Sequence, residues 1–167
     1  YSFHTFRDDP DGVSVLSTNR ILSIQPTAAN NVWCITQDRK LYLYDTHLCQ
    51  FLKSSNQIKE KFNVDFRADH IYDIRGGNTW ITSTNSDYLL RTNDTDVLDI
   101  ELIRVGQKGL KSGKVYYIYG DKKHREWILT DKGTTIYGKK FSTAVPYKWI
   151  REVGEYVFLA TENGKVV

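Results

Sequence analysis

The sequence predicts an all-β fold made of repeated, four-stranded antiparallel units. Aromatic residues make up 13% of the 167 residues, and such side chains are favoured on the pleated, half-buried surfaces of sheets. Short runs of β-branched and aromatic residues alternate with turns rich in Gly, Asn, Asp and Lys, and only Gln57 to Phe62 has a helical pattern. A tryptophan also recurs at an even interval, as Trp33, Trp80 and Trp127.

The three tryptophans lie in similar segments, which indicates an internal repeat. Each is followed closely by a threonine, and a fourth copy over 156–161 has Phe158 at the tryptophan position. A pair of apolar residues at i and i+3 precedes each copy: Ile21 and Ile24, Ile71 and Ile74, Val115 and Ile118, Tyr147 and Ile150. A side chain that recurs at one position of a repeat is expected to pack between neighbouring units. The blade core is therefore predicted to contain Trp33, Trp80, Trp127 and Phe158.

Strands are expected in each copy wherever a β-favouring run lies between two turns. The expected strands cover 21–25, 32–36, 41–44 and 49–52, then 71–75, 79–83, 88–91 and 97–103, then 115–119, 126–130, 134–137 and 139–142. Hairpin turns are expected at 131–133 and 162–164. Gly133 and Gly164 would take the positive φ there, which other residues resist.

Four short antiparallel strands repeated about every 45 residues are typical of a β-propeller blade. We therefore predict one partial propeller domain over 1–167, with about three and a half blades. Its parts are an outer strand 1–16 of a preceding blade, blades at about 17–66, 67–110 and 111–143, and an incomplete blade 144–167. An open part of a ring would expose apolar blade faces. The remaining blades of a longer parent, or a second copy of the chain, are expected to cover them.

Charge and cysteine content exclude several classes of function. The 23 Lys and Arg residues are interleaved with 20 Asp and Glu residues, so no stripe of positive charge predicts nucleic-acid binding. No metal and no cofactor is expected, because Cys34 and Cys49 lack partners at metal-ligand spacing. Cys34 is predicted opposite Leu43, which would leave the two sulfurs roughly 9 to 10 Å apart and unbridged. No apolar stretch is long enough to predict direct membrane contact.

The third copy carries the clearest family signature. It has Gly109-Leu110, then Val115-x-x-Ile118, then Trp127-Ile128-Leu129-Thr130 and Gly133. This pattern resembles the two-component regulator propeller repeat, and the resemblance extends over essentially the whole chain. The repeat usually has glycine in its Trp-Ile-Gly-Thr segment, where this chain has Ile35, Thr82 and Leu129.

The resemblance implies the periplasmic sensor region of a hybrid two-component histidine kinase of the bacterial inner membrane. Such sensors respond to oligosaccharides, so it implies carbohydrate sensing and signal transduction rather than catalysis by these residues; the parent chain would carry the kinase. Two other interpretations stay open: a platform for protein interaction, and a propeller lyase. The lyase would need a His or Tyr with a carboxylate partner, and the sequence contains no recognised catalytic motif.

Ligands of propellers usually lie over the central channel, on loops that lead into the inner strands. This placement gives the candidate ligand-binding residues Arg20, Arg67, Asp69, His70, Lys114, Tyr147 and Trp149. The cluster at 67–70 would suit an acidic or sulfated sugar, because Arg makes charge-assisted, bidentate hydrogen bonds. The alternative for that cluster is a local ion pair in a solvated loop. For Trp149 the alternative to ligand contact is packing.

Overall fold

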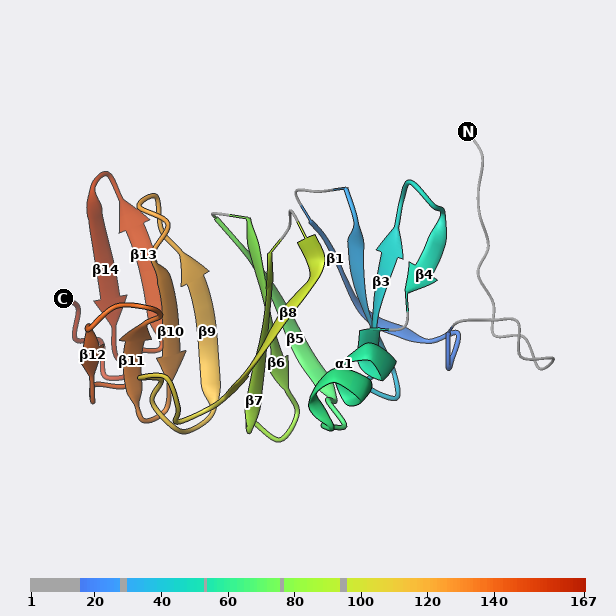
Figure 1. Cartoon of the computed structure of the whole chain (residues 1–167). Helices are drawn as coiled ribbons and strands as arrows, with labels where there is room; N and C mark the ends of the chain where they lie inside the picture. The colour runs from blue at the N-terminus through green and yellow to red at the C-terminus, as the bar shows by residue number, and fades with distance from the viewer. Residues whose placement is uncertain (1–15, 28–29, 53, 76, 94–95) are drawn as a thin grey trace.

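The computed structural model describes residues 16–27, 30–52, 54–75, 77–93 and 96–167, and these form an all-β, propeller-like arrangement of sheets side by side (Figure 1). The described residues form three four-stranded antiparallel sheets and one two-stranded sheet. The outer strand expected at the N-terminus falls on residues 1–15, which lie outside the described residues.

Each four-stranded sheet follows the order of the chain. The first contains β1 (Ile21–Pro26), β2 (Val32–Thr36), β3 (Leu41–Asp45) and β4 (Gln50–Leu52). The second contains β5 (Ala68–Ile74), β6 (Asn78–Ser83), β7 (Tyr88–Asn93) and β8 (Asp96–Arg104). The third contains β9 (Val115–Gly120), β10 (Glu126–Thr130), β11 (Gly133–Ile136) and β12 (Ser142–Thr143), and the last contains β13 (Trp149–Val153) and β14 (Tyr156–Ala160). Strand β5 contacts both β1 and β9, so the first strand of each blade is its innermost.

The apolar cores lie between successive blades, which is how a propeller buries both faces of a sheet. Trp33 and Trp80 are fully buried, and Trp127 is nearly so. Each packs in a cluster that also contains residues of the following blade, such as Ile71 beside Trp33 and Ile118 beside Trp80. The sheets are thus held to one another mainly by burial of these large side chains.

Phe158 does not follow this pattern, although it occupies the equivalent position of the fourth copy. Its side chain is 41% exposed, beside exposed Tyr156 and Val153. Leu159, on the opposite side of β14, packs against Trp127. Phe158 is thus exposed in the described chain, which supplies no blade that covers this face, and its role in a blade core stays a prediction.

The helix α1 (Ser54–Phe62) connects the first two blades. Ile58 is fully buried in the core between these blades. The hydroxyl of Ser55 accepts a hydrogen bond from the backbone N–H of Leu41 at 2.7 Å, which fixes the helix to strand β3. The helical pattern in 57–62 is part of this element.

The first hairpin differs from its expected register by one residue. Cys34 pairs with Tyr42, and it is Trp33 that lies opposite Leu43. The turn is shorter than expected, because the N–H of Thr36 donates to the carbonyl of Lys40 and Arg39 adopts a φ of 65°. The two cysteines are free, as predicted.

Candidate functional site

The first part of the candidate site is an end of the propeller that we call the entry face, formed by the residues that lead into the inner strands and by the second turn of each blade. One backbone hydrogen bond recurs there in three blades. Gln37, Thr84 and Asp131 donate to the carbonyls of Arg20, Arg67 and Lys114 at 2.8, 2.9 and 3.0 Å. The entry face lies along the lower edge of Figure 1, where β9 and β13 begin.

The recurring bond places three predicted residues at one equivalent position. Arg20, Arg67 and Lys114 each accept it and each has an exposed side chain, so the entry face presents one cation per blade. The Arg20 guanidinium donates to the side-chain carbonyl of Gln37 at 3.2 Å. The Arg67 side chain forms an exposed ion pair with Asp65 at 3.5 Å, which corresponds to the solvated-loop alternative.

Asp69 and His70 lie on strand β5 itself and have different surroundings. Asp69 forms an ion pair with Arg39 of the preceding blade at 3.1 Å, with both side chains well exposed. Exposed pairs of this kind contribute little to stability. The ring centroids of His70 and Tyr72 lie 4.9 Å apart, and both residues line one cavity.

Tyr147 and Trp149 have opposite environments. Tyr147 is buried against Trp127 and Leu159, so it packs in the core between blades, and ligand contact by this residue stays a prediction. The i, i+3 apolar pairing with Ile150 was the signal for this packing role. Trp149, the first residue of β13, is 56% exposed.

The second part of the site is a cavity of about 340 Å³ along the three inner strands. We call it the inner-strand wall and define it by Gln25 of β1, His70, Tyr72 and Arg75 on or next to β5, and Tyr117 and Tyr119 of β9. Its volume lies in the range usual for small-molecule sites. Of the residues predicted to bind ligand, His70 is the one that lines this cavity.

Aromatic rings dominate the inner-strand wall. The rings of Tyr72 and Tyr117 meet edge to face, with centroids 5.6 Å apart, and Tyr117 is 43% exposed. Burial raises the pKa of Tyr72 to about 12, with a further contribution from the negative charge of Asp69. Tyr72 therefore stays neutral at physiological pH and offers a hydroxyl that can both donate and accept.

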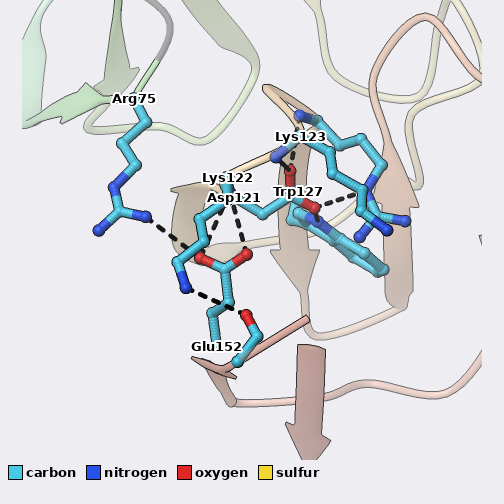
Figure 2. A network of polar contacts seen from close by, with 8 residues as sticks. Arg75, Asp121, Lys122, Lys123, Trp127 and Glu152 are labelled. Carbon is cyan, nitrogen blue, oxygen red and sulfur yellow. Dashed lines mark hydrogen bonds and ion pairs between the residues drawn. The ribbon is translucent and has the colours of Figure 1, made fainter. Parts of the chain in front are cut away.

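One end of the wall carries a charged network that joins three blades (Figure 2). The Arg75 guanidinium donates to the carboxylate of Glu152 at 3.2 Å, and the backbone N–H of Lys122 donates to the same carboxylate at 3.0 Å. The side chain of Arg75 is 58% exposed and that of Glu152 only 6%. Glu152 is thus a buried anchor that holds an exposed guanidinium in place.

Sequence reasoning missed most of the wall. It placed ligand contacts on loops, whereas Tyr72 and Tyr117 lie inside strands. The sequence signal for the wall is the cluster of tyrosines in 116–119, but the same cluster is also typical of an ordinary strand.

The described part of the chain shows no group of three or more His, Cys, Asp or Glu side chains that could hold a metal ion. Within the same residues, no helix has the length and apolar character needed to cross a membrane. The arrangement is one that can bind a ligand by stacking and hydrogen bonding.

Solved structures with the same architecture include extracellular domains of proteins assigned to the hybrid two-component systems of B. thetaiotaomicron. The one from BT3049 is 18% identical, with a TM-score of 0.60 over 96% of this chain, and the one from BT4673 is 17% identical, with a TM-score of 0.58 over 90%. Virginiamycin B lyase from Staphylococcus aureus is 15% identical, with a TM-score of 0.50 over 92% of this chain and 57% of its own.

At these identities the likeness establishes the propeller fold. The chain spans 22% and 20% of the lengths of the BT3049 and BT4673 structures. No protein-family model and no curated protein sequence matches the chain.

Proposed function

We propose that the chain is the ligand-sensing, periplasmic part of a bacterial two-component sensor histidine kinase and that its ligand is an oligosaccharide. The architecture shared with extracellular domains of hybrid two-component systems supports the class of protein. The observation that carries the ligand is the pair Tyr72 and Tyr117, which is open to a cavity lined by inner strands of three blades.

The geometry favours a sugar because the wall combines flat rings with polar groups. A tyrosine ring packs against the C–H face of a pyranose, while its hydroxyl hydrogen-bonds to the substituents. Gln25 adds an amide that can donate and accept, and Arg75 adds N–H donors. A ligand held across inner strands of different blades would stabilise one arrangement of those blades. It would thereby shift the population of signalling states in the parent kinase.

The partners we propose besides the ligand are further blades. The exposed Phe158 occupies the position at which Trp33, Trp80 and Trp127 are each covered by a following blade. The remaining blades of a parent chain, or a second copy, would remove this apolar surface from water.

The catalytic alternative is less well supported by the wall. A lyase needs a His or Tyr with a carboxylate partner, and no carboxylate occurs among the described residues that line the cavity. The ring neighbour of His70 is the neutral Tyr72.

A glycan array probed with the 167-residue chain tests the proposal. We expect a restricted set of glycans to bind, and we expect Tyr117→Ala to weaken that binding about fivefold or more, since stacking contributes on the order of 1 kcal/mol or more. Tyr156→Ala is the matched control, because Tyr156 is also exposed but lies beside Phe158 on β14 and does not line the cavity. If no glycan binds, or if Tyr117→Ala binds as tightly as the parent chain, the proposal is wrong.

A further inference from the structure

We infer that the inner-strand wall selects oligosaccharides that carry a carboxylate or sulfate group, and that Arg75 binds this anion. The inference rests on the proposed function, since it names the class of sugar for the same site. It follows from the charges of the wall, from the way Arg75 is held, and from the cations at the entry face.

The charges that line the wall have one sign. Arg75 contributes a permanent positive charge and His70 an imidazole, and the described lining residues include no Asp or Glu. A neutral sugar would leave the guanidinium without an anionic partner from the ligand. An anionic sugar would gain a charge-assisted hydrogen bond, which is about twice as strong as a neutral one.

The position of Arg75 is fixed in advance, which reduces the entropy lost on binding. Glu152 accepts a bond from Nη1 of Arg75, and the Lys122 N–H holds Glu152 in turn (Figure 2). A guanidinium has five N–H donors in a planar fork, so one bond to Glu152 leaves donors for a ligand. The buried anchor and exposed head are the arrangement expected of a positioned anion-binding arginine.

Lys122 makes the same end of the wall net positive. Its ammonium donates to the carbonyl of Gly154 at 3.0 Å, close to the carboxylate that its own N–H binds. Arg75 and Lys122 together outweigh the charge of Glu152, and the neighbouring carboxylate of Asp121 is paired with Arg125. This residual positive charge favours an anionic group at the end of the cavity rather than over the tyrosine rings.

The entry face adds a longer-range attraction. Arg20, Arg67 and Lys114 project one exposed cation from each of three blades at the equivalent position. Arg67 is paired with Asp65, which offsets its charge. A local excess of positive charge raises the concentration of an oppositely charged ligand, and salt weakens this effect. Recognition of a neutral sugar would not require these cations at the entry face.

The experiment compares acidic and neutral glycans of matched backbone. Oligogalacturonate and its fully methyl-esterified form share one backbone and differ in charge, and sulfated and desulfated carrageenan oligosaccharides, which have no carboxylate, differ in the same way. Both pairs are printed on an array that also carries other acidic and neutral glycans. We expect binding to acidic glycans, at least tenfold stronger than to neutral ones, and reduced by added salt.

Arg75→Gln should weaken this binding tenfold to a hundredfold, as expected for loss of a hydrogen bond to a charged group. Arg104→Gln is the matched control, because Arg104 is an exposed arginine at the end of the outer strand β8. Glu152→Gln keeps an oxygen that can accept the Arg75 hydrogen bond and leaves the Arg75 charge, so it should weaken binding much less than Arg75→Gln does. If Arg75 acted only by joining blades, Glu152→Gln would reduce binding to the same degree.

The outcomes separate the two proposals. Equal binding of neutral and acidic glycans, or unchanged acidic binding by Arg75→Gln, would overturn the inference and leave sugar sensing in place. A complete absence of glycan binding would overturn both. Preference for sulfate over carboxylate, or the reverse, would identify the anion, since either group meets the same guanidinium.

Discussion

The hydrogen bonds of Asp121 provide the sharpest test of how a blade is stabilised. One carboxylate oxygen of this buried residue accepts the N–H groups of Lys123 and Arg125, each at 2.9 Å. The other accepts the indole N–H of Trp127 at 2.9 Å and the Arg125 guanidinium. Asp121→Asn keeps the shape and one acceptor oxygen, but it turns an N–H₂ donor toward the two side-chain donors.

The expected loss follows from these contacts. An unpaired N–H at the buried Trp127 costs about 1 to 3 kcal/mol. Loss of the pair with Arg125, which is partly screened by solvent, costs about 0.5 to 1 kcal/mol. Asp121→Asn should therefore lower the free energy of unfolding by roughly 2 to 4 kcal/mol. Urea denaturation followed by far-ultraviolet circular dichroism measures it.

A double-mutant cycle isolates the indole bond. Trp127→Phe removes the donor, so the cycle of Asp121→Asn with Trp127→Phe should show a coupling energy of about 1 to 2 kcal/mol. The indole N–H of Trp80 is buried and has no hydrogen-bond partner among the described residues. The control cycle with Trp80→Phe should be additive within about 0.5 kcal/mol. Additivity in both cycles would refute the reasoning.

The same variant predicts a pH dependence with a definite sign. Burial alone would raise the pKa of Asp121, but the bonds from Trp127 and Arg125 outweigh burial and lower the pKa below its ordinary value. A lowered pKa stabilises the fold above the unfolded value of about 3.9, and that contribution is lost as the pH falls through the folded value. The stability gap between the parent chain and Asp121→Asn should be widest near neutrality and shrink in acid. A constant gap down to pH 3 would contradict this assignment.

Three further predictions concern other parts of the fold. Glu126→Gln should lower the free energy of unfolding by roughly 2 to 4 kcal/mol in urea titrations. The reason is that the nearly buried Glu126 forms two hydrogen bonds with Arg91, at 2.9 and 3.0 Å. A change below about 0.5 kcal/mol would show that the pair is dispensable. In timed alkylation with mass spectrometry the exposed Cys49 should react first, and Cys34 should react far more slowly because burial raises its pKa to about 11; equal rates would mean that the first blade opens readily. Gly120→Ala should lower the thermal midpoint by several degrees, since a Cβ there would lie 2.7 Å from a backbone oxygen of the neighbouring blade; an unchanged midpoint would place the blades further apart.

The strands were predictable because each is decided locally. A run of β-branched or aromatic residues between two turns leaves little choice, and the recurrence of Trp33, Trp80 and Trp127 gave the spacing of the sheets. The register of a hairpin was less predictable, because it depends on the backbone of its turn. Arg39 adopts a left-handed conformation that no sequence pattern predicts, and this shifts the register so that Cys34 pairs with Tyr42.

Of the candidate site, only the entry face was predictable from the sequence. Arg20, Arg67 and Lys114 precede inner strands, and chain order alone places such residues at one end of a propeller. The wall depends instead on how neighbouring inner strands are rotated against one another, which brings Tyr72 of one blade to Tyr117 of the next. No pattern within either strand distinguishes a tyrosine that faces the cavity from one that packs between blades.

The repeats differ in their side-chain hydrogen bonds even where the backbones of their turns are equivalent. This difference indicates which bonds the fold requires. Thr27 donates its N–H to the carbonyl of Asn31 at 2.8 Å, as Asp121 does to that of Arg125 at 3.1 Å, so the two turns are equivalent. Among the described residues, the shorter threonine accepts the N–H of Asn31, at 3.3 Å, and the indole N–H of Trp33 has no partner there. Burial of the tryptophan is thus common to both blades, whereas the carboxylate bond is not. Packing between blades therefore sets the architecture, and the polar bonds at the turns adjust the stability of individual blades.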